Sequence, residues 1–144
     1  MVPVQVSHLV SLDGEQGWLL GLLDQAGQRV LPIQIGSAEA FAIAAGVQER
    51  PPARPSTHDL MLAVIGRLGG SIERVIVHDL HEDTFISQLD IATPAGVQEV
   101  DCRPSDAVAL AVRARCAILV DEDVLEQAAV PLGQDGSAGV IDED

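Results

Sequence analysis

The sequence predicts an α+β fold in which a mixed, largely antiparallel sheet packs against three to four helices. Two observations support this prediction: short β-branched runs separated by turns that contain Gly or Asp, and apolar helical stripes preceded by Ser or acidic residues. The 144 residues are 47% hydrophobic, with one Trp and two Phe. The chain is therefore long enough to form a core, which must consist mainly of aliphatic side chains.

The first part of the chain predicts three strands, over residues 2–12, 18–23 and 29–35. Each run is rich in Leu or β-branched residues, which favour a pleated and half-buried surface. Asp13-Gly14 and Gly27 mark the turns between the runs. Because these connections are short, the three strands should form an antiparallel meander.

Two helices should follow this meander. The first covers residues 38–47 behind Ser37, a favourable N-cap, and is apolar apart from Glu39, so we expect it to be largely buried. A loop over 48–55 with three prolines interrupts the helical pattern. The second helix then begins with the Ser-x-x-acid pattern of residues 56–59, and its apolar residues fall on one stripe.

The next part of the chain repeats the order of strands and helix. Strands are predicted over 72–80, 85–92 and 97–102, followed by a buried helix over 106–115. Ser105 should cap this helix by accepting hydrogen bonds from its first backbone amides.

The end of the chain predicts a short strand over 117–120 and a helix over 121–129. We therefore place one domain over residues 1–130. Residues 131–144 mix Gly, Ser and acidic residues, which predicts an acidic disordered tail.

The charge balance restricts the partners that this chain can bind. Eight Arg, no Lys and 22 acidic residues give a net charge of −14, and the resulting field repels nucleic acid and anionic lipid. A partner that carries phosphate would need a local Arg pocket or bridging cations. Cys102 and Cys116 fit neither a disulfide framework nor a zinc site. Without a signal-peptide pattern or an apolar run of about 18 residues, we expect a soluble, cytoplasmic protein with no membrane partner.

An Arg-Pro-Ser segment at residue 103 gathers charge where a strand meets a helix. Asp101, Arg103 and Asp106 should converge there, and the helix dipole favours an anion at Asp106. The junction is either a chemical site or a structural one in which Arg103 pairs with Asp101 or Asp106. The same three residue types precede a helix at Arg54, which suggests two duplicated strand–helix units.

The Arg-Pro-Ser segment at Arg54 also introduces His58 and Asp59. His58 lies at the edge of the apolar stripe, and Asp59 should project from the opposite face of the helix. His58 could ligate a metal or transfer a proton, or it could be a half-buried residue bonded to a backbone carbonyl. Arg54 could hold a phosphate or neutralise the acidic surface. Glu39 could ligate a hard cation or interact with its helix dipole.

Three segments of the chain resemble the bifunctional nuclease domain. They are residues 31–40, residues 54–60 followed by 68–70, and residues 101–113, of which the last is the most specific. Their order and spacing match the family over roughly residues 3–130. On these motifs the chain is identified as a bacterial member of the bifunctional nuclease family.

The resemblance implies a compact α+β fold that often forms oligomers, and some members, chiefly from plants, degrade both DNA and RNA. It therefore leads us to expect a homo-oligomer whose partner is single-stranded or nonspecific nucleic acid. This chain has Ser56 where the family usually has Leu, a change that should affect local packing more than chemistry.

The leading hypothesis is a nuclease that hydrolyses phosphodiester bonds of DNA and RNA with a divalent metal, Mg²⁺ or Mn²⁺, which would activate water. Its candidate residues fall at three helix starts, where anions are naturally held. The candidate catalytic residues are His58, Asp59, Asp101 and Asp106; the candidate metal ligands are Glu39, Asp101 and Asp106; the candidate phosphate-binding residues are Arg54 and Arg103.

The alternative is a non-enzymatic oligomeric module that binds a protein or a small anion, with the same motif residues in structural roles. One geometric condition separates the two hypotheses. An open cleft that joins Glu39, His58 and Asp106 favours catalysis, whereas wide separation or full pairing in a dry core favours the structural alternative.

Overall fold

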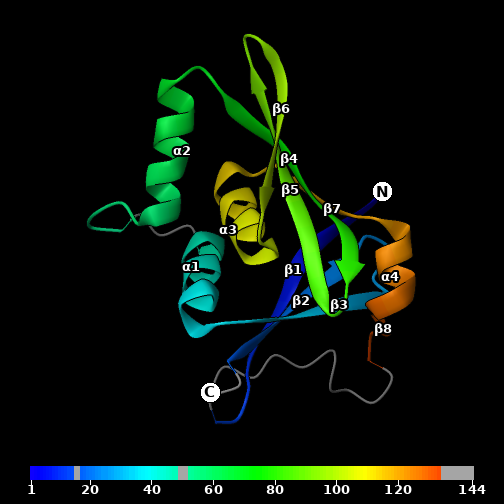
Figure 1. Cartoon of the computed structure of the whole chain (residues 1–144). Coiled ribbons are helices and arrows are strands. Elements are labelled where there is room, and N and C mark those ends of the chain that lie inside the picture. Colours follow the sequence, from blue (N-terminus) through cyan, green and yellow to red (C-terminus); the bar gives the residue numbers. More distant parts are fainter. Residues whose placement is uncertain (15–16, 49–51, 134–144) are drawn as a thin grey trace.

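The computed structural model describes residues 1–14, 17–48 and 52–133, and this part of the chain forms one sheet and four helices (Figure 1). The strands are β1 (Val2–Ser11), β2 (Trp18–Asp24), β3 (Arg29–Ile35), β4 (Ser71–His81), β5 (Thr84–Thr93), β6 (Gly96–Cys102), β7 (Ala117–Val120) and β8 (Val130–Pro131). The helices are α1 (Ser37–Gln48), α2 (Thr57–Arg67), α3 (Pro104–Ala114) and α4 (Glu122–Ala128). The predicted α+β class is therefore confirmed.

The eight strands form a single mixed sheet in the order β6-β5-β4-β7-β1-β2-β3-β8. Only β4 and β7 pair in parallel within this sheet, and every other described neighbour pair is antiparallel. The sheet thus contains two meanders, β1-β2-β3 and β4-β5-β6, which meet at β7. Figure 1 shows α1, α2 and α3 on one side of the strands and α4 on the other.

Each meander leads into a helix, since α1 follows β3 and α3 follows β6. This order agrees with the idea of two duplicated strand–helix units. The two Arg-Pro-Ser segments do not occupy equivalent places, however. The segment at Arg103 opens α3 directly after β6, whereas the segment at Arg54 opens α2, an additional helix that follows α1.

Helix α3 is the centre of the core. Five consecutive residues, 107–111, are buried at 1% exposure or less, because α3 packs on the sheet while α1 and α2 cover its other sides. The helix begins at Pro104 with Arg103 in the N-cap position, so the prediction that Ser105 caps it was wrong. Proline suits the first helical turn because its missing N–H has no partner to lose there.

Helix α1 is less buried than its composition predicted. It packs closely on α3, where a Cβ added to Gly46 would lie 2.6 Å from Val112 Cγ2. This contact covers only one side of the helix, so Phe41 is 64% exposed and Val47 is 48% exposed. The expectation of a largely buried helix was wrong because α1 lies at the edge of the helical layer.

Helix α2 carries the predicted apolar stripe but buries none of its residues. It contacts α3 and β4 and leaves several large apolar side chains exposed to solvent. The edge strand β6 lies nearby and exposes further apolar residues. The exposed side chains are Leu60, Met61 and Val64 on α2, Leu68 at its C-cap, and Val97 and Val100 on β6.

The end of the described chain adds β8, which pairs with Arg29 and Val30 at the edge of the sheet. Most of the predicted acidic tail, residues 134–144, lies outside the described residues. None of the helices in the described ranges has the length and apolar character needed to cross a membrane.

Candidate functional site

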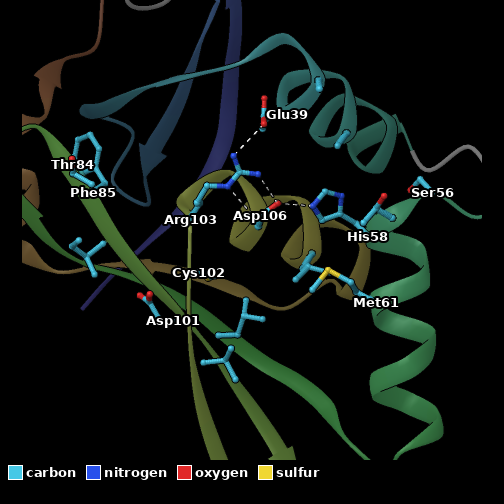
Figure 2. Close-up of a pocket in the computed structure, with 17 residues that line it drawn as sticks. Glu39, Ser56, His58, Met61, Thr84, Phe85, Asp101, Cys102, Arg103 and Asp106 are labelled. Carbon is cyan, nitrogen blue, oxygen red and sulfur yellow. Dashed lines mark hydrogen bonds and ion pairs between the residues drawn. The ribbon is translucent and has the colours of Figure 1, made fainter.

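A pocket of about 880 Å³ lies where the starts of α1, α2 and α3 face β5 and β6 (Figure 2). The helices supply polar side chains at their first turns, and the strands supply a wall that is mostly apolar. The lining residues that matter for chemistry are Glu39, Ser56, His58, Asp101, Arg103 and Asp106.

Arg103 joins the carboxylates of Glu39 and Asp106 at this pocket. Its Nε donates to Asp106 Oδ2 at 3.0 Å, its Nη2 donates to Asp106 Oδ1 at 3.4 Å, and its Nη1 donates to Glu39 Oε2 at 3.2 Å. The Arg103 side chain is nevertheless 63% exposed, so the guanidinium remains open to solvent. Of the two pairings left open by the sequence, the structure shows Arg103 with Asp106.

His58 approaches the same carboxylate from α2. Its Nε2 lies 2.9 Å from Asp106 Oδ1, and the imidazole is 12% exposed (Figure 2). Because an ionised carboxylate only accepts hydrogen bonds, Nε2 carries the proton in this pair. No hydrogen bond engages Nδ1 among the residues that the structure describes. The imidazole is thus oriented through Nε2 alone within the described residues.

The environment of Asp106 favours its ionised form. Burial by itself raises the pKa of this carboxyl, but the hydrogen bonds from Arg103 and His58 and the positive charge of Arg103 outweigh burial and lower it. Asp106 is therefore an ionised hydrogen-bond acceptor near neutral pH. This state fits a residue that orients His58 rather than one that donates a proton.

Asp59 lies outside the pocket, and its carboxylate is bonded to residues that hold α2 in place. Its Oδ2 accepts hydrogen bonds from the backbone N–H and the hydroxyl of Ser56, and its Oδ1 accepts from Arg113 Nε at 2.9 Å. These hydrogen bonds, led by the one from the Ser56 backbone, lower the pKa of Asp59. They also confirm the predicted helix start at Ser56.

His58 and Asp59, which were predicted on opposite faces of α2, both reach α3. His58 contacts Asp106, and Asp59 contacts Arg113, two helical turns further along the same helix. The two adjacent residues of α2 therefore contact α3 near its two ends, and together they fix the position of α2.

The remaining candidates differ in their relation to the pocket. Asp101 lines the pocket from the end of β6 and is exposed. Within the described ranges, Arg103 forms ion pairs with Asp106 and Glu39 and not with Asp101. Arg54 is exposed in the segment before α2 and is absent from the residues that line the pocket. The structure thus brings together Glu39, His58, Arg103 and Asp106. Asp101 belongs to β6, which forms part of the strand wall of the same pocket.

Comparison with known proteins identifies the family of this chain. The model of the bifunctional nuclease domain matches residues 20–133, which include all seven candidate residues. The chain belongs to the bifunctional nuclease family.

Two proteins of Mycobacterium tuberculosis are similar to this bifunctional nuclease domain, one from strain CDC 1551 / Oshkosh and one from strain ATCC 25618 / H37Rv, and both are described as uncharacterized. Each is 44% identical over 110 residues, a region that covers 76% of this chain and 65% of the relative. The match therefore spans less than two thirds of each relative's length.

The sequence did not point to the apolar wall of the pocket. Phe85, Leu89 and Val100 come from strands whose alternating pattern indicates only a half-buried sheet, and Met61 belongs to an ordinary helical stripe. A single sequence carries no signal that such residues face a pocket. Cys102 also lines it, but burial raises the pKa of its thiol, so it is not an activated nucleophile.

The donor set of the bifunctional nuclease site does not fit a divalent metal in this arrangement. The Arg103 guanidinium occupies the position between the Glu39 and Asp106 carboxylates and pairs with both. In the part of the chain that the structure describes, no group of three or more His, Cys, Asp or Glu side chains is arranged to hold a metal ion. Metal binding would require Arg103 to move away.

The ionised state of Asp106 predicts a specific dependence of stability on pH. Its pKa is lower in the folded chain than its ordinary value of 3.8, so its stabilising effect is complete above that value and is lost as pH falls towards the folded pKa. We expect Asp106→Asn to lower the free energy of unfolding at pH 7, and the difference from wild type to shrink at about pH 3. Urea unfolding at both pH values measures this effect.

The matched control for this experiment is Asp101→Asn, a change in the same pocket at an exposed carboxylate that Arg103 does not engage. Its effect on stability should be small at both pH values. An Asp106→Asn effect that is the same size at neutral and acidic pH would contradict the proposed ionised state.

Proposed function

We propose that this domain hydrolyses phosphodiester bonds of DNA and RNA at the pocket formed by the starts of α1, α2 and α3. The observation that supports this proposal is the junction of Glu39, His58, Arg103 and Asp106 at one open pocket, with Arg103 still 63% exposed. These side chains come from the consecutive helices α1 and α2 and from α3, which follows them much later in the sequence, and the fold brings them to one opening. This shared opening supports catalysis over a purely structural role.

Arg103 would orient the phosphate and offset charge as it develops on the phosphoryl oxygens. A guanidinium has five N–H donors, and three of them form the bonds to Asp106 and Glu39, which leaves two for a ligand. The planar arrangement of these donors suits phosphate oxygens. Glu39 and Asp106 would hold the guanidinium in place before the substrate arrives.

His58 would act as the proton-transfer group. Asp106 accepts a hydrogen bond from Nε2, so in the neutral imidazole Nδ1 would be the nitrogen that takes a proton from an attacking water or, in RNA, from the ribose hydroxyl. This assignment makes Asp106 a residue that positions the base. Asp101, on the β6 wall of the same pocket, would be the second proton-transfer group.

The two other candidates receive different roles in this proposal. Asp59 would be a positioning residue, because it fixes α2, and thereby His58, through Ser56 and Arg113. Arg54 would contact a second phosphate outside the pocket, since it is exposed just before the start of α2. No step of this mechanism passes through a metal.

A second candidate function is an oligomeric module that binds a protein or a small anion without catalysis. The observation in its favour is the complete pairing of Asp106, both of whose oxygens accept hydrogen bonds from Arg103 or His58. Exposed apolar side chains on α2 and β6 offer a surface for a second copy of the chain. In this case the ion pairs would only lock α1, α2 and α3 together.

Substitution in the pocket separates these two functions. His58→Ala and Asp106→Asn should each lower the hydrolysis rate of single-stranded DNA and RNA by roughly 10²–10⁴-fold, the usual contribution of a positioned acid–base group. The control is Arg29→Gln, which breaks ion pairs with Asp24 and Glu122 that do not line the pocket. Equal residual activity in all folded variants and wild type would indicate a contaminant and reject the nuclease.

Removal of divalent metals tests the metal-free form of this mechanism. Because Arg103 occupies the position between the two carboxylates, we expect the rate to stay within about twofold of its original value after dialysis against a chelator. The rate of hydrolysis of one oligonucleotide with chelator, and then with added Mg²⁺ or Mn²⁺, gives the answer. Loss of activity with the chelator and recovery with Mn²⁺ would support the metal-dependent nuclease that the sequence suggested.

A further inference from the structure

The pocket that holds the charged cluster also has a large apolar wall, which an ion-pair network alone does not require. Eight of its lining residues are apolar, and in Figure 2 Phe85 and His58 lie on opposite sides of Arg103 and Asp106. Phe85 is only partly buried, and Met61 is 37% exposed, so both can still contact a ligand. The apolar lining residues are Ala38, Ala42, Met61, Phe85, Ile86, Leu89, Val100 and Leu110.

The size of the pocket suits one small ligand with a flat apolar part and an anionic part. Its volume of about 880 Å³ falls within the range of small-molecule sites, roughly 300–1,000 Å³. A nucleobase has a π-face that stacks on aromatic and apolar side chains, and the phosphate of the same nucleotide would lie near Arg103. The apolar wall and the guanidinium therefore match the two parts of a single nucleotide.

The charge around the pocket opposes a long polyanion. Arg103 is the only Arg among its lining residues within the described ranges, whereas Glu39, Asp101 and Asp106 are acidic. The chain as a whole carries a net charge of −14. Proteins that bind long strands use a positively charged groove that follows the backbone, and each further phosphate here would meet a repulsive field instead.

We propose that the pocket binds one nucleotide unit, with its base on the Phe85 wall and its phosphate on Arg103, so that the substrates are dinucleotides and strand ends. This inference rests on the proposed function and specifies its substrate class. It also predicts an inverted salt effect. Salt weakens the binding of a strand to a basic groove, but here it should screen repulsion and accelerate the hydrolysis of a long strand.

Binding of two small probes tests the nucleotide pocket without any need for catalysis. Adenosine monophosphate carries a base and a phosphate, whereas ribose 5-phosphate lacks the base. We expect Phe85→Ala to weaken binding of adenosine monophosphate by roughly tenfold or more, and binding of ribose 5-phosphate by less than about twofold. Phe41→Ala is the matched control, since Phe41 is the other Phe of the chain, is exposed, and does not line this pocket.

Hydrolysis measurements test the preference for short substrates. We expect kcat/KM for a dinucleotide to exceed that for a single strand of about 20 nucleotides and for its duplex, and the rate on the long strand to rise between about 20 and 200 mM salt. Equal effects of Phe85→Ala on both probes, or a long-strand rate that is higher and falls with salt, would overturn the inference while leaving the nuclease intact. Probe binding as predicted, without hydrolysis of any substrate, would retain the nucleotide pocket and reject the nuclease.

Discussion

The burial of α3 is the constraint on which the site depends. Residues 107–111 are enclosed by the sheet, α1 and α2, so the first turn of this helix can move very little. That turn carries Asp106, and the N-cap position before it carries Arg103. Every contact of the charged cluster is made to one of these two residues. Helices α1 and α2 therefore place Glu39 and His58 against Arg103 and Asp106, whose positions are fixed by α3. Small shifts of α1 or α2 would change the site without changing the core.

The ion pairs of α3 also show how structural and chemical roles are divided along one helix. At its C-terminal end, Arg113 is 9% exposed and pairs with Asp59 outside the pocket, which is an arrangement for holding α2. At its N-terminal end, Arg103 is 63% exposed and faces the pocket, although it too pairs with carboxylates. An ion pair this exposed contributes little to the stability of the fold, because solvent screens the attraction between its charges. The exposed end is therefore the one at which a ligand can compete for the guanidinium.

Most of the fold could be predicted from the sequence, because the patterns that specify it are local. Each predicted strand in the two meanders ends within one residue of the observed strand, since alternation and turn residues define both ends. The errors concern packing. The apolar composition of α1 could not reveal that only one of its sides is covered, and Ser105 resembles a cap although Pro104 already begins the helix. The short strand β8 has two residues and too little pattern to be recognised.

The candidate site was predictable in its charged residues but not in its pairing or its apolar wall. Motifs at three helix starts identified Glu39, His58, Arg103 and Asp106, because these charged or titratable residues stand next to apolar helical segments. Which charges meet depends on the tertiary arrangement, so Asp59 was grouped with the pocket although it pairs with Arg113 outside it. Phe85 was missed because an aromatic residue in a strand looks like any other core residue.

The most direct test of substrate binding at Arg103 is a crystal structure of the domain with a dinucleotide whose phosphodiester is replaced by a phosphorothioate that resists hydrolysis. We expect the phosphorothioate within hydrogen-bond distance of the Arg103 guanidinium, a base against Phe85, and His58 Nδ1 facing the scissile bond. A ligand bound elsewhere, with the Arg103 pairs to Asp106 and Glu39 unchanged, would contradict this expectation and would assign this cluster to structure alone.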